Sequence, residues 1–78
     1  MLTPERLAAR HPSTTEKLGW LHVPHLPPHL LAVAEPFERV AHELAEHTAD
    51  HPQLTLALQH LIDAKDCAVR AKIAQVAD

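Results

Sequence analysis

Apolar residues recur at helical spacing in the last third of the chain, over residues 54–76. This stretch contains neither Pro nor Gly and is rich in Ala and Leu, which favours one continuous helix. At about 100° per residue, its larger apolar side chains share one face: Leu54, Leu58, Leu61, Ile62, Val69, Ile73 and Val76. Lys65 and Lys72 lie on the same face, within about 40° of its centre. An ammonium group is costly to bury alone, so these lysines either extend to water or meet an anion.

A second helical pattern covers residues 28–49. Its apolar stripe consists of Leu30, Val33, Phe37, Val40, Ala41, Leu44 and Thr48. Four glutamates lie off this stripe and are expected to face solvent: Glu35, Glu38, Glu43 and Glu46. Pro36 falls inside the pattern and removes a backbone hydrogen bond, which predicts a kink or two helical pieces.

The link between these two patterns, residues 50–52, is short. Helices joined in this way are antiparallel neighbours, so an αα-hairpin is expected. Asp50 is expected to cap the last helix, with Pro52 tolerated in its first turn.

The N-terminal part of the chain is punctuated by proline. Residues 3–5, Thr-Pro-Glu, predict a short helix that begins after Thr3 and continues to about Arg10. Residues 13–16 have the spacing of a capping box, and Gly19 is expected to end that single turn in the left-handed conformation. Residues 20–28 contain three of the seven prolines and are expected to be extended.

The predicted fold class is therefore all-α, in one small domain. Residues 1–28 are expected to form a short N-terminal helical arm and residues 29–78 an antiparallel two-helix hairpin. A chain of 78 residues rarely builds a large core alone, and this one has only two aromatic residues. Its single cysteine, Cys67, excludes an internal disulfide and is expected to be a buried packing residue. Self-association, as a dimer or higher multiple, is expected to complete the core.

Composition and charge narrow the possible partners. A net charge of −3 argues against a nucleic-acid polymer, whose binding needs a broad cationic surface. The N-terminal residues lack an apolar signal segment and no run reaches membrane-spanning length, so a cytoplasmic protein without a membrane partner is expected. Residues 65–72 nevertheless carry three cations (Lys65, Arg70 and Lys72) against one anion, Asp66. This segment is the candidate site for a small anion.

The eight histidines invite a metal interpretation, which their spacing does not support. His42 and His47 are five residues apart, so their rings point about 140° apart on a helix and do not form a zincin motif. Solvated surface histidines are the favoured interpretation, and no metal or cofactor is expected. The sequence also lacks a phosphate loop and a nucleophile elbow. No catalytic residue is identified, and a non-enzyme is expected.

Trp20 allows two interpretations. In a protein of this size a Trp is often a core plug that docks an arm. The alternative is a platform on which a nucleobase stacks, since a stacked base contributes about 1–3 kcal/mol. An aromatic ring beside cations is what a nucleotide ligand requires.

Two stretches of the chain resemble a known family. Residues 54–74, LTLALQHLIDAKDCAVRAKIA, follow a short turn and an arm, residues 20–30, of the form WLHVPHLPPHL. The chain here resembles small proteins of actinobacterial phages and prophages. These are similar to the hairpin-domain family of phage cyclic-nucleotide sponges, which counter CBASS defence and are related to an anti-Thoeris sponge. The resemblance is clearest at Leu54-Thr55 and at residues 64–71.

The resemblance implies a specific activity in the bacterial host cytoplasm. Such sponges are helical hairpins, assembled up to hexamers, that hold cyclic di- or trinucleotides between protomers without cleaving them. It implies that Trp20 stacks on a base, that Lys65, Arg70 and Lys72 bind phosphates, and that Thr55 is a further ligand contact. Unlike those proteins, this chain has no Tyr or Phe near its N-terminus. The alternative function is a protein-interaction or structural helical module without a small-molecule ligand.

Overall fold

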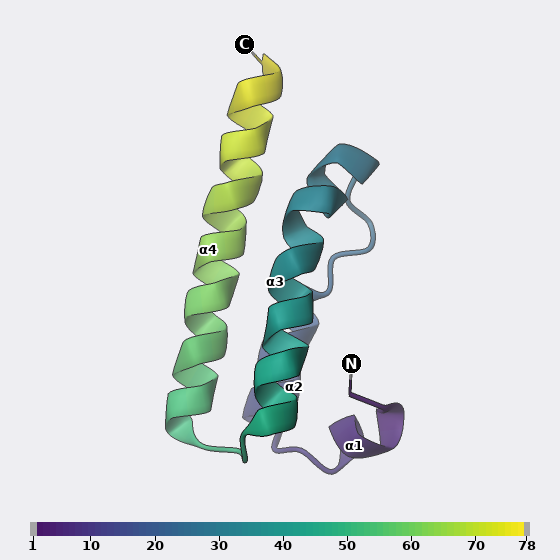
Figure 1. The fold of residues 1–78 in the computed structure, drawn as a ribbon, viewed down its shortest axis with the longest axis vertical. Helices are drawn as coiled ribbons and strands as arrows, with labels where there is room; N and C mark the ends of the chain where they lie inside the picture. Colours follow the sequence, from purple (N-terminus) through teal and green to yellow (C-terminus); the bar gives the residue numbers. More distant parts are fainter. Residues whose placement is uncertain (1, 78) are drawn as a thin grey trace.

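The computed structural model describes residues 2–77 of the chain, with the side chains of residues 2–75. It contains four helices: α1 (Pro4–Ala8), α2 (Pro12–Leu21), α3 (Pro28–His47) and α4 (Pro52–Ala77) (Figure 1). No strand occurs within residues 2–77, so the all-α prediction is confirmed. Among the same residues, no helix has the length and apolar content needed to cross a membrane.

The three longer helices lie side by side (Figure 1). α3 and α4 run in opposite directions and contact each other, and α2 packs against both of them. α1 lies at the end of the molecule where α3 is joined to α4. The radius of gyration is 13.2 Å, against about 11.5 Å for a compact chain of this length, because α4 extends past the other helices.

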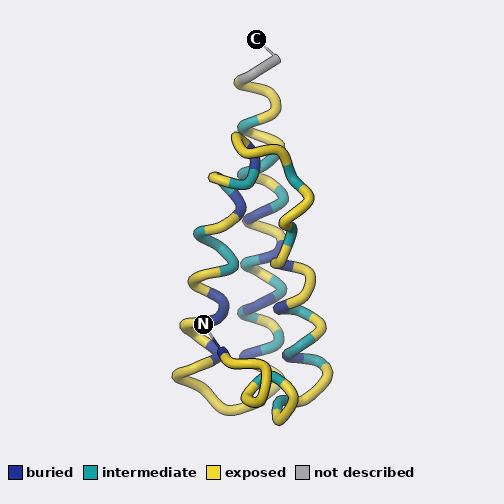
Figure 2. Tube along the Cα trace, turned by 90° about the vertical axis from the view of Figure 1, so that its right-hand side faces the viewer, coloured by how far each residue is buried: buried dark blue, intermediate teal, exposed yellow. Residues whose placement is uncertain are grey.

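The core lies between α2, α3 and α4, and the buried segments of each face inward (Figure 2). Its buried members are Leu2, Leu18, Leu21, Ala41, Ala45, Leu54, Leu58 and Ile62. Phe37 is only half-buried at its edge. The largest fully buried side chains are therefore leucines, and the core is small.

α2 differs from the expected single turn. It is a helix of ten residues, and its N-cap is His11, whose side chain accepts a hydrogen bond from the Ser13 backbone N–H. Gly19 lies inside this helix, and no glycine in the described part of the chain has a positive φ. The helix continues through Gly19 because Leu18 and Leu21 are buried on either side of it. The expectations of a capping box at residues 13–16 and of a left-handed Gly19 were wrong.

α3 is one continuous helix with Pro36 inside it, not two pieces. Its buried face is rotated from the predicted stripe: Val40 and Leu44 are 41% and 38% exposed, whereas Ala34, His42 and Ala45 are buried. The rotation arises because α2 packs against α3 beside α4. The predicted stripe assumed α4 as the only partner helix. For the same reason Glu38 is half-buried toward α2 and not fully in solvent.

The predicted face of α4 is buried over its first half. Ile73 is exposed because the C-terminal part of α4 extends beyond the other helices (Figure 1). The side chain of Val76 lies outside the described residues. Cys67 is exposed, which contradicts the predicted buried packing role. It is nine residues after the buried Leu58, and at about 100° per residue this places it on the opposite side of the helix.

Candidate functional site

The side chain of Asp50, in the link between α3 and α4, is hydrogen-bonded to the start of α2. Its carboxylate accepts hydrogen bonds from the His11 backbone N–H and the Thr14 hydroxyl, each at 2.8 Å, and from Arg10 Nε at 2.8 Å. The bonds from His11 and Thr14 lower the pKa of Asp50 from 3.8 to about 2. Asp50 therefore places a negative charge at the N-terminus of α2, beside the N-cap residue His11, where an anion is stabilising. The predicted cap on α4 was wrong, since the His51 ring accepts from the Gln53 N–H there.

Arg10 binds the C-terminal end of α3 through backbone carbonyls. Its Nη1 donates to the Ala45 carbonyl at 2.6 Å and its Nη2 to the Thr48 carbonyl at 3.0 Å. The last carbonyls of a helix have no partner within the helix and carry partial negative charge. Arg10 thus stabilises the C-terminus of α3 while it is bound to Asp50.

Lys65, a residue of α4, lies against the C-terminal end of α2. The residue is only 7% exposed, and its Nζ donates to the Trp20 carbonyl oxygen at 3.0 Å. It also forms an ion pair with Asp66 at 3.3 Å. A lysine on the apolar face of α4 is therefore explained by a backbone carbonyl of this chain. The predicted partners were water or an anion, and the carbonyl at a helix terminus was not among them.

The structure brings only some of the predicted ligand residues together. The backbone carbonyl of Trp20 contacts Lys65. Trp20 as a whole is 61% exposed. The core-plug interpretation of Trp20 was therefore wrong. Arg70 is exposed about 7.5 Å farther along the axis of α4 than Lys65, and Lys72 is half-buried. Thr55 is about 15 Å away from Lys65 in the other direction, and its hydroxyl lies 3.4 Å from the His51 carbonyl oxygen.

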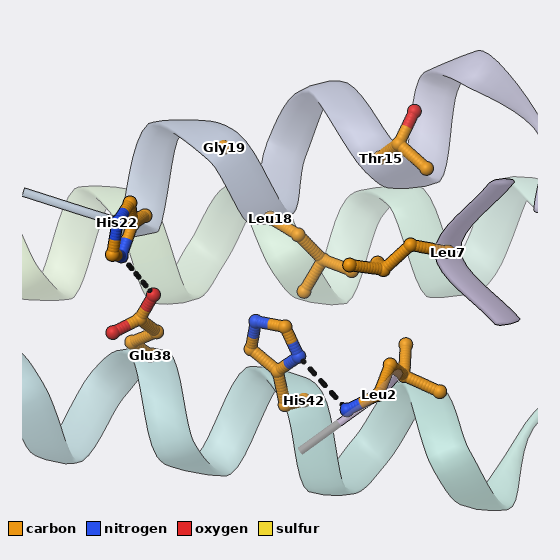
Figure 3. A pocket seen from close by; sticks show the side chains of 8 residues that line it. All are labelled: Leu2, Leu7, Thr15, Leu18, Gly19, His22, Glu38 and His42. Atoms are coloured by element: carbon orange, nitrogen blue, oxygen red, sulfur yellow. Dashed lines mark hydrogen bonds and ion pairs between the residues drawn. The ribbon is translucent and has the colours of Figure 1, made fainter. Parts of the chain in front are cut away.

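A separate pocket of about 380 Å³ lies between the N-terminal segment, α2 and α3 (Figure 3). Leucine side chains and Thr15 form much of its lining, together with Gly19. One end is polar, because the His22 ring and the Glu38 carboxylate are 2.6 Å apart there. The complete lining is Leu2, Leu7, Thr15, Leu18, Gly19, His22, Glu38 and His42.

His42 forms part of the wall of this pocket. It is buried, and its Nδ1 accepts the Leu2 backbone N–H at 3.5 Å. Burial lowers the pKa of His42 below 6.5, although the nearby Glu38 acts in the opposite direction. The ring is thus neutral at pH 7, and its proton is on Nε2 because Nδ1 is the acceptor.

Sequence reasoning missed this pocket and placed His42 among the solvated histidines, which was wrong. The available signal was the spacing of Glu38 and His42, which are four residues apart and so share one side of a helix. Among the described residues, no three His, Cys, Asp or Glu side chains gather closely enough to hold a metal ion.

Comparisons of the chain with protein-family models, with curated proteins and with solved structures found no match.

Proposed function

We propose that the protein is a non-enzymatic interaction module that binds a second copy of itself through one face of the α3–α4 pair. The observation that carries this proposal is an apolar, uncharged surface on the side of the pair away from α2. α2 occupies the other side, where Lys17 donates to Gln59 of α4 and His22, the residue after α2, contacts Glu38 of α3.

This surface, called here the eight-residue face, has the same spacing on both helices. On α3 it consists of Val33, Phe37, Val40 and Leu44, and on α4 of Ala57, Leu61, Ala64 and Ala68. Each set has steps of four, three and four residues and spans about 60° of its helix. Alternating steps of three and four are typical of helices that pack in four-helix bundles. All eight members are half-buried or exposed in the single chain.

The two halves of the face differ in size in a way that suits a twofold pair. The α3 half carries bulky side chains, whereas three of the four members on α4 are alanines. If α3 of one copy lies against α4 of the other, large side chains meet small ones, and twofold symmetry repeats the contact. The hollow of about 550 Å³ beside Leu44 and Ala57 lies at one end of this face.

The side of the α3–α4 pair that carries this face is large enough for a specific dimer. α3 has 20 residues and is about 30 Å long. Two helices spaced about 8–10 Å apart present a side about 20 Å wide, hence about 600 Å² per copy over the whole length of α3. The eight-residue face, about 17 Å long, is the apolar centre of this side. The total of about 1,200 Å² reaches the lower limit of stable interfaces. A dimer would also enlarge a core that contains no fully buried aromatic side chain.

We expect the protein to have a mass of about 17 kDa by light scattering at micromolar concentration, twice the 8.6 kDa of one chain. Val40→Glu and Leu44→Glu should each give a folded monomer, because a carboxylate buried in the interface loses its hydration. Leu56→Glu is the matched control, since Leu56 is 47% exposed and outside the face. A parent protein that remains monomeric, or a control that dissociates equally, would contradict the proposal.

A second candidate function is capture of a cyclic nucleotide beside Trp20. It is favoured by the 61% exposure of Trp20, the larger of the two aromatic residues, in a protein with a small core. The exposed indole offers a stacking surface, and Arg70, about 7.5 Å farther along α4 than Lys65, offers a phosphate contact. Lys65 is bound to the Trp20 carbonyl, so in this proposal it positions the ring, and Arg70 and Lys72 meet the phosphates.

Trp20 is the only Trp, so its fluorescence tests this second function directly. Titration with cyclic di- and trinucleotides should change the emission saturably. Arg70→Ala should weaken binding about tenfold to one-hundredfold, because a charge-assisted hydrogen bond contributes about 1.5–3 kcal/mol. Arg39→Ala, an exposed arginine on α3, is the control and should bind like the parent. Unchanged emission with every nucleotide would exclude capture at Trp20.

A further inference from the structure

Gly19 is the only glycine in the chain, and it lies in the last turn of α2, where the backbone conformation does not require glycine. Its φ is not positive, so its conformation is open to any residue. A Cβ built at this position would meet no atom within 4 Å, so close packing does not require glycine either. Glycine inside a helix is less stable than alanine because the unfolded chain has more freedom. Gly19 therefore has a role other than stabilising α2.

The role is indicated by what Gly19 faces. It lines the pocket of about 380 Å³ together with Leu18 of the same helix (Figure 3). The absence of a side chain keeps this part of the pocket open. The volume is within the range of about 300–1,000 Å³ that is common for small-molecule sites.

The pocket also presents two polar groups at one end. The Nε2–H of His42 is a donor, and Figure 3 shows this ring nitrogen directed into the space between Leu18 and His22. The Glu38 carboxylate lies at the same end, with Oε2 bound to His22. Its other oxygen has capacity to accept a hydrogen bond. A ligand of this apolar pocket therefore needs an apolar body and a polar group that can both accept and donate a hydrogen bond.

We infer that this pocket binds a small neutral molecule with an apolar body and one hydroxyl group, of the phenol type. The hydroxyl oxygen accepts from His42 Nε2–H, and the hydroxyl proton is donated to Glu38. A ligand carboxylate would face the charge of Glu38, and an ammonium group would offer His42 no acceptor. The site is separate from both the eight-residue face and Trp20, and so does not depend on either proposed function.

The test uses phenol and Gly19→Ala on the full chain. We expect phenol to shift the backbone amide signals of Thr15, Leu18 and Gly19 saturably in nuclear magnetic resonance spectra. Gly19→Ala should raise the thermal midpoint of the free protein by about 2–8 °C, because alanine favours the helix. The same substitution should weaken phenol binding at least tenfold, because its methyl group fills pocket space. Opposite effects on stability and on binding distinguish a ligand site from a structural glycine.

Two controls complete the experiment. Glu16→Ala changes an exposed residue of α2 outside the pocket and should leave phenol binding unchanged. Toluene has the same ring without the hydroxyl and should bind more weakly than phenol. The inference is overturned if phenol causes no saturable shift, if toluene binds equally well, or if Gly19→Ala binds phenol like the parent. A lower midpoint for Gly19→Ala would also overturn it, since glycine would then be required by the fold.

Discussion

Lys65→Met is expected to lower the free energy of unfolding by about 1.5–3 kcal/mol, the usual contribution of a hydrogen bond to a charged group. On the sequence alone, the change places an apolar side chain on an apolar face and should be neutral or stabilising. In the structure, Lys65 Nζ donates to the Trp20 carbonyl at the end of α2, and methionine cannot replace this bond. Urea unfolding at a fixed protein concentration measures the difference.

The matched control for this prediction is Lys72→Met. Lys72 lies on the same face of α4, about 10.5 Å farther along the helix axis than Lys65, and is half-buried. Its substitution should change stability by no more than about 0.5 kcal/mol, as is usual for surface positions. Equal losses in the two variants would contradict a specific role for Lys65 at the terminus of α2.

Leu58→Ala is expected to have the largest effect of any single substitution discussed, a loss of about 2–5 kcal/mol. Leu58 is 0% exposed and belongs to the cluster where α4 meets α2 and α3. Removal of three side-chain carbon atoms leaves a cavity that the packed helices close only in part. Circular dichroism during urea unfolding should show a lower midpoint with an unchanged slope.

Leu56→Ala removes the same atoms from an exposed side of the same helix. The expected change is within about 0.5 kcal/mol, because Leu56 is 47% exposed. A comparable loss at Leu56 would mean that this side of α4 is covered in solution, in conflict with the face proposed for self-association.

The helices themselves were largely predictable from the sequence. Thr3 caps α1 through the Arg6 N–H as expected, and α3 begins at Pro28 and ends within two residues of the predicted limit. The strong periodicity and the absence of Pro and Gly identified α4. These features depend on neighbours in the sequence, which is why local patterns were sufficient.

The rotation of α3 and the role of Lys65 were not predictable in this way. Both depend on α2, which was expected to be only a single turn ended by Gly19 and followed by an extended stretch from residue 20. The partner of Lys65 is a backbone carbonyl 45 positions earlier. Every residue has such a carbonyl, so the pattern of side chains cannot identify it. The pocket is formed by the N-terminal segment, α2 and α3 together, so no single stretch of sequence contains it.

The contacts of Asp50 and Lys65 at the two ends of α2 also bear on the order in which the chain folds. α2 has ten residues, fewer than the roughly 12–15 that an isolated helix needs to be stable in water. The anion at its first turn and the cation at its last are both supplied by later parts of the chain. We therefore expect α2 to form only after α3 and α4 have met, although it is synthesised before them. The opposite charges also fix its direction, since a reversed α2 would place like charge at each terminus.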